Sequence, residues 1–223
     1  MNPFVILLGI VVIILIYVLY LYMNTGATTL NYNASLLTTV PPITAISNPG
    51  SLRYAYGVWI YVNSWDSNDT KTIFSRDKNV RLYLDKTSPT LYLDVTNGDM
   101  SKQTVKITDN FALQKWVYLI ISVDNQFVDT YIDGKLVLSK KLVGLPAQPS
   151  SDAVSNPVIL GGSPWDASVS KFIRWTKPID PQTAWDYYLS GNGNTNITKT
   201  LSSYSANLSI LKDNVLSSKI TLF

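Results

Sequence analysis

The sequence predicts an all-β fold, an antiparallel β-sandwich, behind a single N-terminal transmembrane helix. Three observations support this prediction. An uncharged apolar run opens the chain, a period-two alternation of apolar side chains begins at Ser51, and the later apolar stretches are separated by turn dipeptides such as Asp133-Gly134. The chain has 223 residues, which is enough for one ordinary domain with a sizeable core and additional segments.

The apolar run Phe4–Met23 contains twenty residues and no charge. As a helix it would be about 30 Å long, which is roughly the hydrocarbon thickness of a bilayer. Tyr17, Tyr20 and Tyr22 gather near one end, where aromatic rings prefer the membrane interface. The competing interpretation is a cleaved signal peptide, but the run lacks a positive leading region and a small-residue cleavage site. We expect an uncleaved anchor over residues 1–23 of a single-pass membrane protein, with the lipid bilayer as its partner.

The segment 24–50 is rich in Thr, Asn, Ser and Pro, which is typical of a linker. A first short strand is expected near Ile43–Ile46. As a flexible coil, the linker would extend roughly 30 Å from the anchor.

The sandwich is predicted over residues 51–193. On the stretch 53–62, Tyr54, Tyr56, Val58, Ile60 and Val62 fall on one face. The stretch Trp116–Val123 is apolar on both faces, which indicates a central strand covered on both sides. Asn97-Gly98 and Asp133-Gly134 predict type I′ turns. A β-barrel would share this alternation, so the pattern alone leaves that alternative open.

The composition excludes several classes of function. The net charge is +3 with no basic cluster, so we expect no nucleic-acid partner. The chain has no Cys and no His, and all 15 acidic residues are Asp. Structural zinc sites and nucleophiles activated by an imidazole base therefore lack their usual ligands and bases. Only Asp could supply the carboxylate pair of a glycosidase. We predict no catalytic residues and no enzymatic activity.

Two loops carry the candidate ligand-binding residues. The first, "WDSNDT", contains Trp65, Asp66 and Asp69, and the second, "GGSPWD", contains Trp165 and Asp166. A sugar could stack on an exposed indole, although a Trp packed under its loop is the ordinary alternative. Calcium takes six to eight oxygen ligands, so these aspartates make calcium the one candidate cofactor. The alternative is that they are ordinary loop aspartates exposed to solvent. No residue is assigned as a metal ligand.

The C-terminal tail, residues 194–223, alternates weakly and ends in apolar residues. One interpretation is a frayed end, and the other is a strand added along a neighbouring protein. The apolar ending favours the added strand.

Several motifs occur in an order that resembles a known family. They are "YGVWIYV", "TIFSRD", "LYLDV", "LQKWVYLIISVDNQFVDTYIDGKLV", "PVILGG" and "SKFIRWTKPIDPQTAWDYYLSG". Together they resemble the concanavalin A-like lectin/glucanase superfamily in its laminin-G-like jelly-roll form, over roughly residues 43–193. A short helix is predicted from Pro181 to Leu189, with Asp180 as N-cap and Gly191 as its stop. The chain departs from the family at Val117, where His is common, and it lacks the Glu residues of the glucanase catalytic strand.

An N-terminal anchor that carries a jelly roll is similar to membrane-anchored virion proteins of large double-stranded DNA viruses. The resemblance implies a non-catalytic structural or interaction module, an assembly protein linking a membrane to a protein shell, as a minor capsid protein does. Its partners would be capsid or scaffold proteins, and its location the internal membrane or capsid of a virion. The alternative is a carbohydrate-binding membrane lectin. A third hypothesis, an Asp-only hydrolase, requires two Asp side chains facing each other in one cleft.

Overall fold

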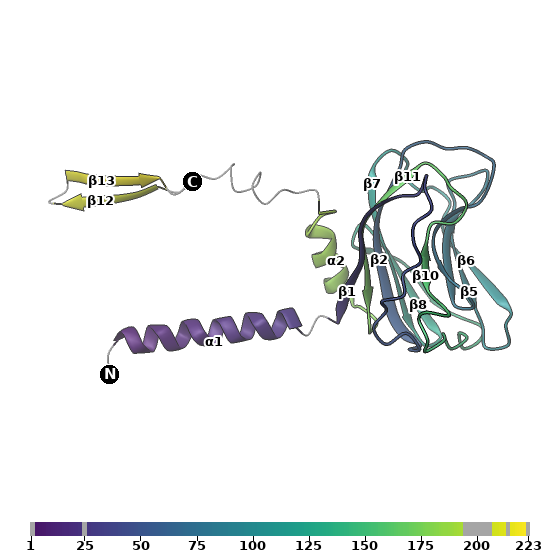
Figure 1. The fold of residues 1–223 in the computed structure, drawn as a ribbon, viewed down its shortest axis with the longest axis horizontal. Coiled ribbons are helices and arrows are strands. Elements are labelled where there is room, and N and C mark those ends of the chain that lie inside the picture. Colours follow the sequence, from purple (N-terminus) through teal and green to yellow (C-terminus); the bar gives the residue numbers. More distant parts are fainter. Residues whose placement is uncertain (1–2, 24–25, 194–206, 213–214, 222–223) are drawn as a thin grey trace.

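A computed structural model describes residues 3–23, 26–193, 207–212 and 215–221 of the chain. Its body is a sandwich of two antiparallel β-sheets (Figure 1), which confirms the predicted all-β fold. The period-two alternation produces this architecture because each strand buries one face against the other sheet.

One sheet has six strands in the order β1-β11-β2-β7-β8-β9. These strands are β1 (Ala27–Ser35), β11 (Ala167–Trp175), β2 (Arg53–Val62), β7 (Trp116–Asp124), β8 (Phe127–Ile132) and β9 (Lys135–Lys141). The other sheet has five strands in the order β10-β3-β4-β5-β6. These strands are β10 (Val158–Leu160), β3 (Lys71–Arg76), β4 (Val80–Leu84), β5 (Leu91–Thr96) and β6 (Lys102–Thr108).

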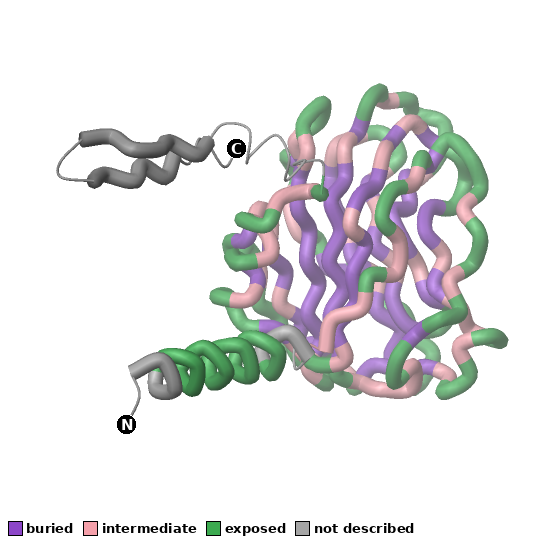
Figure 2. Tube along the Cα trace, turned by 60° about the vertical axis from the view of Figure 1, so that its left-hand side comes forward, coloured by how far each residue is buried: buried purple, intermediate pink, exposed green. Residues whose placement is uncertain are grey.

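The main core lies between the two sheets. The face of β2 that begins at Tyr54 and ends at Val62 points into it, together with Val117, Leu119 and the other odd-numbered apolar residues of β7. Phe74 of β3 and Phe172 of β11 meet at the centre, with their ring centroids 5.2 Å apart. Figure 2 shows these buried stretches on the strands of the sandwich.

A second apolar cluster covers the outer face of the six-stranded sheet. It contains Trp59, Tyr118 and Trp175, and helix α2 (Pro181–Leu189) packs over it. The helix begins as predicted, because the Asp180 side chain accepts a hydrogen bond from the amide of Thr183 and Pro181 follows at the first position. β7 is therefore covered on both sides, as its sequence predicts.

The region predicted as a linker differs from the expectation. Residues 27–35 form β1, an edge strand that pairs antiparallel with β11. Thr and Asn in this stretch suggested a coil, but the edge of the six-stranded sheet offers its backbone hydrogen-bond partners. The strand expected near Ile43–Ile46 is reduced to a single bridge between Ile43 and Val158.

Helix α1 spans Pro3–Met23, and its described side chains, those of residues 7–20, are all exposed. Among the residues that the structure describes, no helix has the length and hydropathy needed to cross a membrane. The transmembrane role of the segment stays a prediction.

The two predicted type I′ turns have different outcomes. Asp133 and Gly134 both have positive φ, 49° and 75°, so the β8–β9 hairpin is as predicted. Neither Asn97 nor Gly98 has a positive φ. In the β5–β6 turn it is Met100 that has one, at 66°. The turn is longer than two residues because the amide of Asn97 bonds to the carbonyl of Ser101.

In the tail, β12 (Asn207–Lys212) and β13 (Val215–Thr221) pair with each other as a separate two-stranded sheet. Addition of the tail to a neighbouring protein as a strand stays a prediction. The tail residues 194–206, 213–214 and 222–223 lie outside the described part of the chain.

Candidate ligand-binding groove

A groove of about 690 Å³ lies on the outer face of the five-stranded sheet. Its volume is within the range of about 300–1,000 Å³ that is usual for small-molecule sites. Its lining residues come from β3, β4, β5, β6 and β10, from the β3–β4 and β5–β6 turns and from the segment before β10. They are Ser75, Arg76, Asp77, Lys78, Val80, Arg81, Asp94, Thr96, Met100, Lys102, Ser155, Asn156, Pro157 and Ile159.

The strand register aligns polar side chains across the floor of the groove. Ser75 of β3 pairs with Arg81 of β4, Arg81 pairs with Asp94 of β5, and Asp94 pairs with Thr104 of β6. Since directly paired residues lie on the same face, these four side chains form one row on the outer surface. Their neighbours along each strand, such as Leu82, point into the main core.

Arg81 is held in place by contacts with β3, with the loop before it and with its own strand. Its Nε donates to Thr72 Oγ1 at 3.0 Å, and its Nη2 donates to Thr70 Oγ1 at 2.7 Å. The guanidinium also lies 4.5 Å from the centre of the Tyr83 ring. This cation–π contact and the fixed hydrogen bonds leave a preorganised cation facing the groove.

Asp94 is fixed from two sides. Its Oδ1 accepts a hydrogen bond from Thr104 Oγ1 at 2.7 Å and one from the Tyr83 hydroxyl at 3.3 Å. Burial and the neighbouring carboxylate of Asp94 raise the pKa of Tyr83, so this phenol stays protonated as a donor. Tyr83 also stacks on Tyr92, with 5.7 Å between the ring centroids.

One end of the groove, the turn end, is built from turns. Lys78 lies on the β3–β4 turn, Met100 and Lys102 flank the end of the β5–β6 turn, and Asn156 lies on the segment before β10. The Asn156 side chain donates to the Asp77 carbonyl at 3.2 Å, which joins this segment to the β3–β4 turn. The arrangement can offer hydroxyl, amide, carboxylate and cationic groups to a polar ligand.

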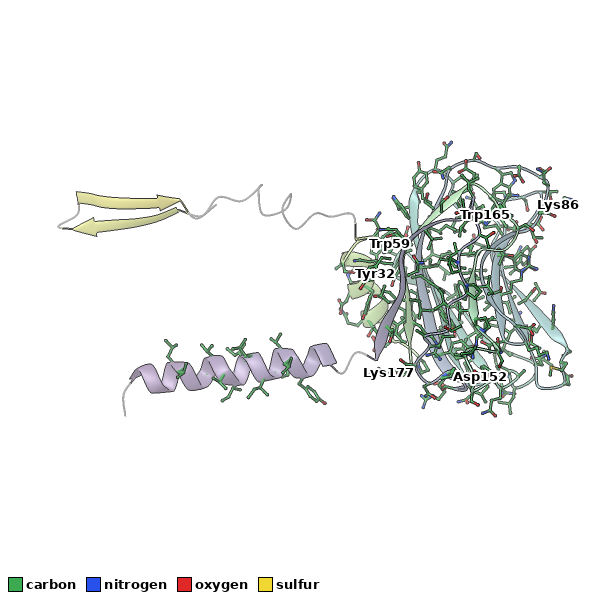
Figure 3. All side chains as sticks on the ribbon, in the orientation of Figure 1. Tyr32, Trp59, Lys86, Asp152, Trp165 and Lys177 are labelled. Carbon is green, nitrogen blue, oxygen red and sulfur yellow. The ribbon has the colours of Figure 1, made fainter. Side chains whose placement is uncertain are left out.

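The sequence-predicted site residues lie at the opposite end of the sandwich, in the loops around the ends of β2 and β11. Figure 3 shows Trp165 there, at the other end from Asp152, whose carbonyl accepts a hydrogen bond from the amide of the groove residue Asn156. In the first loop, the buried Lys71 Nζ donates to Asp66 Oδ1 at 3.0 Å and to the carbonyl of Asp69 at 3.0 Å, and lies 4.7 Å from the Trp65 ring centre. A hydrogen bond from the Asn68 amide, together with Lys71, holds the pKa of Asp66 below its usual value.

The second loop is equally occupied by internal contacts. Trp165 is 4% exposed, and its indole Nε1 donates to the Thr72 carbonyl at 2.9 Å. Trp165 is therefore packed under its loop and offers no stacking surface, whereas Trp65 is half-buried and sugar stacking on it stays a prediction. Asp166 accepts hydrogen bonds from Asn63 Nδ2 at 2.9 Å and from Ser64 Oγ at 2.7 Å.

The five predicted residues are thus brought to one rim, but they mainly bond to the protein itself. Within the described residues, no group of three or more acidic side chains is close enough to hold a metal ion. Sequence reasoning overlooked the groove residues. The signal that could have found them is the outward charge of Arg81 and Asp94 in strands that otherwise alternate with apolar residues.

Comparison with known proteins gives a family match over most of the chain. Residues 38–190 match the laminin-G-type model described as the concanavalin A-like lectin/glucanases superfamily. No curated protein matches the chain at a significant level.

Similar solved structures include receptor-binding domains of botulinum neurotoxins. The serotype D binding domain has a TM-score of 0.57 and 13% identity, over 74% of this chain and 44% of that one. A serotype D ligand-binding domain in complex with N-acetylneuraminic acid has a TM-score of 0.56 and 13% identity, over 72% and 42%. The neurotoxin DC domain in complex with rat synaptotagmin II has a TM-score of 0.51 and 18% identity, over 64% and 37%. The match spans less than half of each of these chains, and at such identities it shows the fold alone.

Proposed function

Because the chain belongs to the concanavalin A-like lectin/glucanases superfamily, we propose that it is a non-catalytic module that binds a saccharide in the groove of its five-stranded sheet. The observation that carries this proposal is the polar row of Ser75, Arg81 and Asp94 on the groove floor, in which hydrogen bonds hold Arg81 and Asp94. Saccharides present many hydroxyl groups, and a site of preorganised donors and acceptors recognises them with little ordering cost.

The botulinum domains that share the fold support a binding role by analogy. One of them is described in complex with N-acetylneuraminic acid and another in complex with rat synaptotagmin II. Since a fold hosts many functions, the proposal depends on the groove itself.

A glycan-binding measurement tests the proposal directly. The full chain in detergent micelles is applied to an array of neutral and acidic oligosaccharides, beside a Ser75→Trp variant that fills the groove. Ser139→Trp, an exposed position on β9 of the other sheet, is the matched control. Both variants are checked for unchanged thermal unfolding.

Binding that is lost in Ser75→Trp and kept in Ser139→Trp supports the proposal. Absence of binding to every saccharide, or equal binding by both variants, overturns it.

The proposed absence of catalysis has its own check, because the groove contains two carboxylates, Asp77 and Asp94. Asp94 already accepts two hydrogen bonds on the sheet floor, which favours a positioning role in ligand binding. We expect no new reducing ends when the protein is incubated with the oligosaccharides it binds. Reducing ends that disappear in an Asp94→Asn variant would instead support the Asp-only hydrolase.

We further propose that α1 anchors this module to a membrane. The support is the uncharged run Phe4–Met23 and the exposure of its described apolar side chains, between 44% and 68% for Leu7–Tyr20. Exposed apolar surface of this extent is unfavourable in water. The full chain should float with phosphatidylcholine vesicles and resist alkaline extraction. An Ile13→Lys/Ile14→Lys variant should partition less well, and recovery of the unaltered chain in the vesicle-free fraction would reject the anchor.

The second candidate function is an assembly protein that links a membrane to a protein shell. The observation that favours it is the β12–β13 hairpin, which among the described strands pairs with neither sheet of the sandwich. An isolated two-stranded hairpin is at best marginally stable in water, so a protein neighbour would stabilise it. Crosslinking mass spectrometry in the native membrane or particle distinguishes the two functions. Crosslinks from Lys212 or Lys219 to shell proteins would favour assembly.

A further inference from the structure

The groove carries an unequal charge. Four cationic side chains line it, those of Arg76, Lys78, Arg81 and Lys102, against the two carboxylates of Asp77 and Asp94. Clefts lined by one sign of charge raise the local concentration of ligands with the opposite sign.

Not all of these charges are available to a ligand. Arg76 is 2% exposed and donates to three carbonyl oxygens, and Asp94 accepts two hydrogen bonds from its neighbours. Lys78 and Lys102 are exposed at the turn end, where Asp77 is exposed as well. Among the described residues the ion pairs are Arg53–Asp124, Lys71–Asp66, Lys106–Asp109 and Lys115–Asp133, and none of them involves a lysine of the groove.

The two lysines are brought to the same end by the topology of the sheet. Lys78 lies in the turn that joins β3 to β4, and Lys102 begins β6 directly after the β5–β6 turn. In antiparallel strands that are consecutive in the sheet, these turns lie at the same end. Arg81 lies further along the floor, next to the Asp94 carboxylate in the cross-strand row.

From this arrangement we infer that the ligand is an acidic saccharide, whose carboxylate or sulfate group lies at the turn end near Lys78 and Lys102. Its ring hydroxyls then contact the polar row of Ser75 and Asp94. This inference rests on the proposed function, because it names the class of saccharide for the same groove.

The test compares three saccharides that share one disaccharide core, using the full chain in detergent micelles. They are lactose, 3′-sialyllactose and 3′-sulfated lactose, so the charged group is either absent, a carboxylate or a sulfate. We expect both acidic sugars to bind about tenfold more tightly than lactose. Raising the salt from about 0.05 M to about 0.5 M NaCl should weaken only the acidic sugars, because it screens the charges.

Charge-reversal variants locate the acidic group. Lys78→Glu and Lys102→Glu should each reduce the affinity for the acidic sugars several-fold and leave lactose unchanged. Lys86→Glu makes the same change in the β4–β5 loop, at the other end of the sheet (Figure 3), and should alter neither.

The outcomes separate this inference from the proposed function. If lactose binds as well as the acidic sugars, or if Lys86→Glu has the same effect as Lys102→Glu, the inference is wrong while saccharide binding stands. If the chain binds no saccharide on the broader array, the proposed function fails and the inference fails with it. A preference for only one of the two acidic sugars supports the inference and identifies the group.

Discussion

Arg76 and Arg174 project from opposite sheets and donate hydrogen bonds to successive carbonyl oxygens of one loop. Arg174 of β11 donates to the carbonyls of Ser47 and Asn48, and Arg76 of β3 donates to Pro49 at 2.6 Å. Both side chains are at least 98% buried. Burial lowers the pKa of Arg76, but an arginine keeps its charge in proteins, so the carbonyl dipoles must replace its lost hydration.

Replacing Arg76 should therefore destabilise the sandwich. Arg76→Met removes the donor and leaves the carbonyls of Pro49, Ser150 and Asn156 without it. We expect the free energy of unfolding to fall by about 2–4 kcal/mol. Arg76→Lys should also be destabilising, because an ammonium cannot reproduce the planar fork. Urea unfolding of the full chain in micelles measures the free energy of unfolding, with a variant at the exposed Lys86, Lys86→Met, as control. A loss of stability in Arg76→Met no larger than that in the control would contradict the prediction.

A side chain at Gly57 should lower the stability of the sandwich. A Cβ built there would lie 2.7 Å from Cη2 of Trp175 and 2.8 Å from the Tyr118 hydroxyl. Because both neighbours belong to the tightly packed second cluster, Gly57→Ala should cost about 1–3 kcal/mol. At Gly98 the nearest atom is 3.7 Å away, so Gly98→Ala is the matched control. Equal melting temperatures for the two variants would contradict this prediction, because they would show that Trp175 and Tyr118 can shift at little cost.

The N-cap of α2 gives a prediction with a pH dependence. The hydrogen bond from the Thr183 amide holds the pKa of Asp180 below its ordinary value. A depressed pKa in the folded state means that the stabilisation is present above the ordinary Asp pKa and is lost as the pH falls through the folded-state value. Asp180→Ala should cost about 1 kcal/mol at neutral pH. This difference should shrink below about pH 4.

Asp180→Asn is the informative control for the cap. The amide oxygen can still accept from Thr183, so stability at neutral pH should stay close to that of the original chain. The part of the acid-dependent loss of stability that comes from Asp180 should disappear, because asparagine does not titrate. A steeper acid loss in Asp180→Asn than in the original chain would argue against the cap.

Trp165 should contribute to stability and have no role in ligand binding. Trp165→Phe removes the indole donor that bonds to the Thr72 carbonyl inside the protein, at a cost of about 1–2 kcal/mol. Saccharide affinity should be unchanged, since the residue lies at the rim opposite the groove. Loss of binding in a Trp165→Phe variant that remains folded would indicate that the saccharide binds at the rim and not in the groove. Measuring unfolding and binding on the same preparation separates these cases.

Much of the sandwich could be predicted from the sequence because its signals are local. The alternation of β2, the doubly apolar β7, the Asp133-Gly134 turn and the capped helix at Asp180 each depend on neighbouring residues alone. β1 could not be predicted in this way. Its residues have a coil-like composition, and only the distant β11 completes their hydrogen bonds.

The groove was missed for a related reason. Arg81 and Asp94 become neighbours only through strand register, and Asn156 joins them from a segment more than sixty residues further along the chain. The rim residues were easier to select because Trp and Asp share short loops. Nothing in the sequence indicates that the neighbouring buried Lys71 already occupies the carboxylate of Asp66.

The β8–β9 hairpin has a practical consequence for engineering. A Cβ at Gly134 would lie 2.9 Å from Cε3 of Trp185, so the tip of this turn is in direct contact with α2. Exposed hairpin tips are the usual places to insert a tag or a reporter domain. Here an insertion would push the helix off the sheet and uncover the aromatic cluster beneath it. The β4–β5 loop at the exposed residues Lys86 and Thr87 is the safer place for a fusion, since α2 does not pack on it.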